Sequence, residues 1–196
     1  IQALEDKAKK KKKPFSKEEY MGGFGHYYRL MMAGVDETLG DLKTYAPNYK
    51  GQGYEIAGFV WFQGFNDKFS DHSTGTYQEN MAHFIRDIRK DLKLPKLPFV
   101  IGAMGHQGTE QKGTTKILAD AQIATPQMPE FKGNVITVKT ADFWDYDAGK
   151  AFENKNKDPD TWGKLGSNRA YHYFGSAAFF EKTGTAFADA IIELGK

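Results

Sequence analysis

The stretch Tyr54-Glu55-Ile56-Ala57-Gly58-Phe59-Val60-Trp61-Phe62 decides the fold. It is a nearly continuous apolar run, rich in aromatic side chains and interrupted by a single charged residue. Runs of this kind are typical of strands that are buried on both faces, and such strands occur in parallel sheets. We therefore expect a central strand of a parallel sheet within residues 54–62.

Strand and helix patterns alternate on the C-terminal side of this run. Short apolar runs predict strands, and apolar residues at three- and four-residue steps predict amphipathic helices. The predicted strands cover residues 99–104 and 134–138, and the predicted helices cover residues 76–92, 114–124 and 176–194. The last helix has a predicted inner face of Ala177, Phe180, Gly184, Phe187, Ala188 and Ile191. This alternation predicts an α/β fold, a three-layer α/β/α sandwich around a mostly parallel sheet.

The N-terminal side is rich in lysine. Residues 1–19 hold seven lysines, five of them consecutive, against four acidic residues, although the net charge of the whole chain is only +2. Neighbouring like charges repel, so we expect residues 1–24 to form a flexible arm or linker before a domain over residues 25–196. Binding of an anionic partner through residues 7–13 is the alternative. Residues 26–45 have helical periodicity that ends before Pro47.

Composition excludes several classes of protein. The chain has 15 Phe, 10 Tyr and 3 Trp, which are enough large side chains for a buried core. It has no cysteine, so it has neither a disulfide framework nor a cysteine nucleophile. No apolar stretch reaches the roughly 18 residues of a membrane-spanning helix. The lysines are not interleaved with aromatic residues, and no metal-binding spacing occurs, so we expect no nucleic-acid partner, metal or cofactor.

Polar residues follow the predicted strands at the positions where parallel α/β sheets bind ligands. Gln63-Gly64-Phe65-Asn66-Asp67 follows the first strand, and His106 follows the second. Each has a structural alternative: the first segment suits a turn with a positive φ at its glycine, and the histidine could pack a loop. Phe143-Trp144-Asp145-Tyr146 after the third strand is an aromatic wall or part of the core. A loop containing His172 precedes the last helix.

Two segments together point to a known family. Gly58-Phe59-Val60-Trp61-Phe62-Gln63-Gly64-Phe65-Asn66-Asp67 and Tyr171-His172-Tyr173-Phe174-Gly175-Ser176 resemble the sialate O-acetylesterase-like branch of the SGNH hydrolases. These proteins are carbohydrate esterases with a three-layer α/β/α fold, and the resemblance covers residues 25–196. It implies hydrolysis of an acetylated carbohydrate, and a periplasmic or extracellular location. In this chemistry a serine attacks the ester, a histidine transfers its proton, and donors at the sheet edge hold the oxyanion.

The resemblance also implies roles for individual residues. His172 is the expected general base, and Gln63 is the expected oxyanion donor, with Gly64 keeping the backbone close. Asp67 and Asn66 are expected to shape the pocket, and Asp67 is also a candidate for orienting the imidazole. We expect three further residues to contact the substrate: His106, Trp144 and Asn168.

The chain departs from the family pattern at two places. No Gly-x-Ser-type segment carries a nucleophile, so we expect another polypeptide segment to complete the sheet and supply the serine of a serine-type carboxylic ester hydrolase. The hydroxyls that the chain itself offers are those of Ser16, Ser70, Ser73, Ser167 and Ser176. Asn168 and Arg169 stand where relatives often have the carboxylate that orients the histidine. The alternative function is therefore a non-catalytic carbohydrate-binding or structural subunit.

Overall fold

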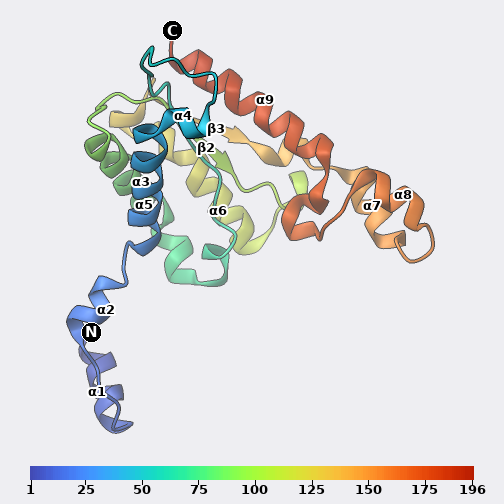
Figure 1. Ribbon diagram of the computed structural model, residues 1–196. Coiled ribbons are helices and arrows are strands. Elements are labelled where there is room, and N and C mark those ends of the chain that lie inside the picture. Colours follow the sequence, from blue (N-terminus) through green and yellow to red (C-terminus); the bar gives the residue numbers. More distant parts are fainter. The chain divides into compact units, whose positions relative to one another are not determined.

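The computed structural model describes residues 1–196, which separate into two compact units, Ile1–Tyr54 and Glu55–Lys196 (Figure 1). The domain boundary expected after residue 24 falls inside the first unit. This unit contains four helices, with no buried residue in any of them: α1 (Gln2–Lys10), α2 (Lys17–Gly22), α3 (His26–Gly40) and α4 (Leu42–Tyr45). Part of the lysine-rich arm is thus helical, because alanine, lysine and glutamate are all good helix formers.

The single helix expected over residues 26–45 is two helices. Asp41 interrupts it with φ −132° and ψ 57°, which are not helical angles. Its carboxylate accepts a hydrogen bond from the Thr44 hydroxyl at 2.7 Å. Aspartate is a weak helix former, and α4 begins immediately after it.

The second unit is α/β, with a small parallel sheet in the order β1-β2-β3. The strands are β1 (Phe59–Trp61), β2 (Phe99–Ala103) and β3 (Val135–Lys139), with Phe59 paired to Phe99 and Phe99 paired to Val135. Every residue of β2 is buried. The sequence pattern therefore located all three strands and predicted their parallel pairing correctly.

The prediction that the first apolar run is a central strand is wrong for this chain. Only Phe59–Trp61 of the run forms a strand, and β1 pairs on one side alone, with β2. The N–H of Phe59 donates to the carbonyl of Pro98 at 2.8 Å, so the alternate residue Val60 directs its own N–H and C=O away from β2. Val60 as a whole is 42% exposed.

Helices cover both faces of this sheet (Figure 1). Phe84 of α5 (Asp71–Asp91) meets Phe99 edge-on at a ring-centroid distance of 6.0 Å, and α6 (Gly113–Ala124) lies beside α5. On the other face, Val100 and Val138 pack against Ala190 of α9 (Ala177–Leu194). The remaining helices, α7 (Tyr146–Asn154) and α8 (Pro159–Leu165), contact each other. None of the helices is long and apolar enough to cross a membrane.

The predicted inner face of α9 is only partly correct. Phe187 and Ile191 pack against the core cluster as expected. The fully buried positions are Phe179, Thr183 and Ala190, whereas Ala177, Phe180, Gly184 and Ala188 are exposed. The observed face is displaced by about one residue because the Phe179 ring stacks on Tyr173 at 4.0 Å. This displacement leaves the Phe180 side chain outside the core.

Candidate functional site

A pocket of about 410 Å³ lies beyond the carboxyl ends of β1 and β2. Its lining comes from residues 62–66, residue 104, residue 106, residues 171–173 and Phe180 of α9. The carboxyl ends of parallel strands meet at one edge of a sheet, which brings these distant segments together. The lining is mostly aromatic with a few polar groups, as is usual for sites that bind small molecules.

Most of the predicted site residues lie at this pocket. Its lining includes Gln63, Gly64, Asn66, His106 and His172. Asp67 and Asn168 are hydrogen-bonded to members of that lining. Trp144 lies outside it and packs against the rings of Phe174 at 5.0 Å and Tyr173 at 6.0 Å. The contact of Trp144 with substrate therefore stays a prediction that this pocket does not support.

Gly64 allows the chain to turn at the end of β1. Its φ of +148° is a conformation that L side chains rarely adopt. A Cβ atom on it would lie 3.0 Å from Leu118, 3.1 Å from Met104 and 3.2 Å from Gln122. Only glycine satisfies both the backbone angle and the close packing. The positive φ expected from the sequence is present.

The Gln63 side chain is held by a carboxylate. Its Nε2 group donates to Oδ2 of Asp67 at 2.8 Å. A carboxylate only accepts hydrogen bonds, so the nitrogen, not the oxygen, of the Gln63 amide faces Asp67. The amide nitrogen carries two hydrogens, and the second has no partner in the structure. One N–H of Gln63 is thus free for a ligand.

His172 is oriented by Asn168, not by Asp67. Its Nδ1 lies 3.1 Å from Oδ1 of Asn168, and the same oxygen accepts the backbone N–H of Arg169 at 2.8 Å. Because this backbone N–H needs an acceptor, Asn168 must present its oxygen to the ring. An amide oxygen only accepts, so Nδ1 carries the proton and Nε2 keeps its lone pair. This is the tautomer that a general base requires.

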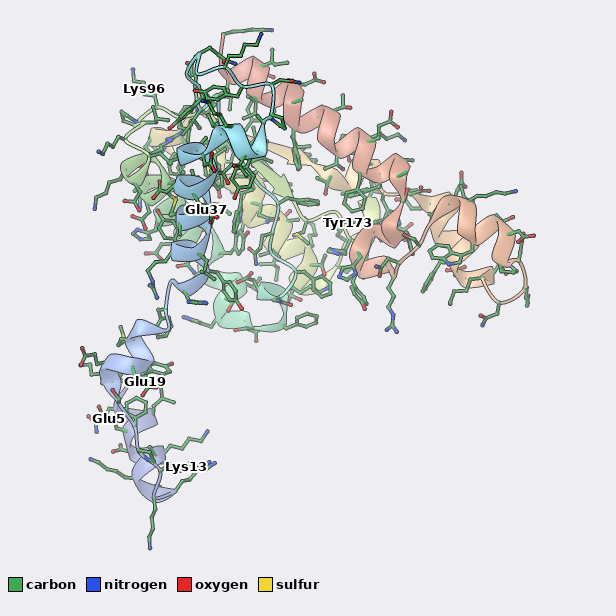
Figure 2. All side chains as sticks on the ribbon, viewed as in Figure 1. Glu5, Lys13, Glu19, Glu37, Lys96 and Tyr173 are labelled. Atoms are coloured by element: carbon green, nitrogen blue, oxygen red, sulfur yellow. The ribbon has the colours of Figure 1, made fainter.

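A tight loop holds this pair in place. The backbone N–H groups of Ser167 and Asn168 both donate to the carbonyl of Phe174, at 2.8 and 2.9 Å. Tyr173 and Phe174 have φ values of +52° and +60°. Two consecutive positive φ angles in non-glycine residues are uncommon, and they turn both rings into the interior while His172 stays exposed. Tyr173 is labelled in Figure 2.

His106 forms the buried wall of the pocket. Its ring stacks on Tyr173 at 4.5 Å and lies 5.0 Å from the Phe65 ring. Its Nε2 lies 2.8 Å from the carbonyl oxygen of Tyr171, so Nε2 is the protonated nitrogen. Burial lowers the pKa of His106, partly offset by the bond to Tyr171. The Nδ1 atom is buried without a hydrogen-bond partner, so the neutral ring offers one unused acceptor.

Two serines of the second unit, Ser70 and Ser176, cap helices. Ser70 caps α5 by accepting the N–H of Ser73 at 3.2 Å. Ser176 caps α9 and donates to Asp145, which itself caps α7. The Ser167 hydroxyl lies so close to Gly175 that a Cβ there would meet it at 2.3 Å. No serine makes a hydrogen bond to His172 in this structure.

Sequence reasoning missed two polar residues behind the pocket, Tyr77 of α5 and Gln122 of α6. Both are buried, at 5% and 0% exposure. The Tyr77 hydroxyl donates to the Gln63 backbone carbonyl at 2.9 Å, and Gln122 Nε2 donates to the same oxygen at 2.8 Å. A signal was present: Gln122 follows Leu118 by one helical turn and so occupies the apolar face of its helix.

One protein family and one individual protein are similar to this chain. The family described as carbohydrate esterase, sialic acid-specific acetylesterase matches residues 15–149. A probable carbohydrate esterase of Arabidopsis thaliana is 38% identical over 56 residues, which are 29% of this chain and 22% of the plant protein. The match thus spans less than a quarter of that relative's length. No solved structure matches the chain. The family match includes Gln63 and His106 and ends before His172.

Proposed function

Because the chain belongs to the sialic acid-specific acetylesterase family of carbohydrate esterases, we propose that its pocket hydrolyses acetyl esters of carbohydrates. The observation that carries this proposal is the shared pocket of Gln63 and His172. His172 has the tautomer of a base, with Nδ1 bound to Asn168. Gln63 retains one N–H for a developing oxyanion. Base and oxyanion donor are the two groups, apart from the nucleophile, that acyl transfer needs.

The proposed reaction begins with a serine hydroxyl that loses its proton to Nε2 of His172 while its oxygen attacks the ester carbon. The carbonyl oxygen becomes negatively charged and accepts a hydrogen bond from Gln63. Collapse of this intermediate returns the proton to the leaving sugar hydroxyl and leaves an acetyl-serine, which water then hydrolyses by the same route. One well-placed oxyanion donor contributes about 3 kcal/mol to such a step.

We propose that the serine comes from a further strand that pairs with the outer edge of β1. Val60 directs its backbone N–H and C=O toward that edge, and β1 has none of the charged residues that usually protect exposed strand edges. A strand added there would end beside Gln63, because all carboxyl ends of a parallel sheet lie together. With this strand the fold would be the three-layer α/β/α sandwich of the SGNH hydrolases. By the same family resemblance we propose a periplasmic or extracellular location.

The test is turnover of p-nitrophenyl acetate by the protein with the serine-bearing strand bound. We expect His172→Ala to abolish turnover, because His106, the other histidine of the pocket, is buried with its Nε2 bound to the Tyr171 carbonyl. His72→Ala is the matched control, since His72 is an exposed histidine at the start of α5 and not part of the pocket lining. Equal loss in both variants, or turnover by His172→Ala at the wild-type rate, would contradict the proposal.

A second candidate function is carbohydrate binding without catalysis. It is favoured by the serines of the second unit, none of which is hydrogen-bonded to His172. Wild-type protein that binds an acetylated sugar in equilibrium dialysis, yet hydrolyses p-nitrophenyl acetate no faster than buffer, would establish this function instead.

A further inference from the structure

The backbone just beyond β1 is fixed by two buried polar side chains, Tyr77 and Gln122. The backbone carbonyl of Gln63 accepts hydrogen bonds from the Tyr77 hydroxyl at 2.9 Å and from Gln122 Nε2 at 2.8 Å. Both donors come from helices on the same face of the sheet, Tyr77 from α5 and Gln122 from α6. The position of Gln63 is thus set by α5 and α6 together.

All hydrogen-bonding groups of the Gln122 amide have partners. Its oxygen accepts the backbone N–H of Met104 at 2.8 Å, and its nitrogen donates to the Gln63 carbonyl and to the Tyr77 hydroxyl at 3.1 Å. The Met104 N–H can only donate and the Gln63 carbonyl can only accept, so the amide has a single possible orientation. Gln122 therefore ties the segment that follows β1 to the residue that follows β2.

Tyr77 also contacts the side chain of Gln63. Its hydroxyl lies 3.4 Å from Oε1 of Gln63, in addition to the shorter bond to the backbone carbonyl. Asp67 holds Nε2 of the same amide at 2.8 Å. Asp67 thus holds the nitrogen of the amide, while the Tyr77 hydroxyl, whose single proton goes to the backbone carbonyl, lies beside its oxygen. Burial raises the pKa of Tyr77 to about 12, so its hydroxyl keeps the proton that it donates.

We propose that Tyr77 and Gln122 are positioning residues that fix the backbone of Gln63, and thereby place its side-chain amide where the oxyanion forms. The inference rests on the proposed esterase function and adds to it, because it assigns a role to two helix residues that touch no substrate. Preorganised donors stabilise a transition state better than mobile ones, because they need no reorganisation during the reaction.

The test compares two conservative variants. Tyr77→Phe removes one hydroxyl and keeps the ring, so the variant should fold. Thr137→Val is the matched control, because the Thr137 hydroxyl donates to the Gln122 backbone carbonyl at 2.8 Å and has no contact with Gln63. We expect Tyr77→Phe to lower kcat for p-nitrophenyl acetate by roughly 10- to 100-fold with little change in KM. Thr137→Val should lower Tm to a similar extent and keep kcat within about twofold.

A spectroscopic measurement separates positioning from stability. The side-chain amide signals of Gln63 in a ¹⁵N–¹H spectrum, assigned by their absence from Gln63→Ala, should move in Tyr77→Phe and stay in place in Thr137→Val. Unchanged signals and kcat in Tyr77→Phe, equal losses of kcat in both variants, or shifted signals without a loss of kcat would each overturn the inference. Wild-type protein that shows no turnover with the serine-bearing strand bound would contradict the esterase function, and the amide signals alone would then decide whether Tyr77 positions Gln63.

Discussion

The orientation of a single amide decides the chemistry that His172 can perform. When asparagine replaces the orienting aspartate of a serine protease, its amide can turn the imidazole to the wrong tautomer, and the rate falls about 10⁴-fold. Here the Arg169 backbone N–H directs the Asn168 oxygen to the ring at the same time. The correct tautomer is therefore kept, whereas the negative charge that would stabilise an imidazolium is missing.

Asn168→Asp is expected to increase esterase turnover, by roughly tenfold or more. A carboxylate can accept both hydrogen bonds that the amide oxygen now accepts, and it adds the missing charge. The measurement is kcat for p-nitrophenyl acetate, with Asn168→Ala as the comparison, which should lose turnover because nothing then holds Nδ1 of His172. A lower kcat in Asn168→Asp than in the wild type would show that the carboxylate does not help this histidine.

His106 should make the fold less stable in acid. Burial lowers its pKa in the folded state, so the unfolded chain binds the proton more tightly. The free energy of unfolding then decreases as the pH falls below about 6.5, until the folded-state pKa is passed. Urea unfolding at about pH 7.5 and about pH 5.5 measures the decrease, which should be smaller in His106→Phe and unchanged in His83→Ala, a change of an exposed histidine. The same decrease in all three proteins would exclude His106 as its source.

Two neighbouring arginines of α5 make different kinds of contact. On α5, Arg86 forms a surface ion pair with Glu130 at 2.6 Å. Arg89, one turn closer to the C-terminus, is 8% exposed and has no carboxylate partner among its hydrogen bonds. Its guanidinium instead donates to the carbonyls of Leu97 and Asn134, which precede β2 and β3. Arg89 thus joins one helix to the starts of two strands.

We expect Arg89→Met to cost about 2–3 kcal/mol in the free energy of unfolding, because it leaves buried carbonyl groups without donors. Arg86→Met should cost at most about 1 kcal/mol, because exposed ion pairs contribute little. Chemical denaturation of both variants gives the comparison. If the two changes cost the same, Arg89 does not carry the connection between α5 and the sheet.

At the scale of the whole molecule, the outer edge of β1 is an edge of the sheet to which no strand is paired. Val60 directs its backbone groups away from β2, whereas Val100 lies in the buried middle strand. In the 196-residue chain alone, the Val60 amide should exchange with deuterium at least about 100-fold faster than that of Val100. Hydrogen exchange followed by NMR measures both, and an intact-mass measurement shows whether another polypeptide is bound. Equal protection of Val60 in the chain alone would contradict a free edge.

The sequence by itself determined where the three strands and the helices around them lie, because apolar periodicity is a property of neighbouring residues. It also determined the glycine turn after β1, since the steric demand at Gly64 is local. The ends of the helices were predicted less accurately than their positions. α5 begins at Asp71, five residues before the predicted start, because Ser70 supplies a cap that periodicity does not reveal.

Only the tertiary structure decided which groups meet. The face of α9 depends on the stacking of Phe179 on Tyr173, and the edge position of β1 depends on which strands pair. Gln63 receives its hydrogen bonds from residues 14 and 59 positions away along the chain. Such contacts arise from the packing of helices on the sheet, which local patterns of hydrophobicity do not encode.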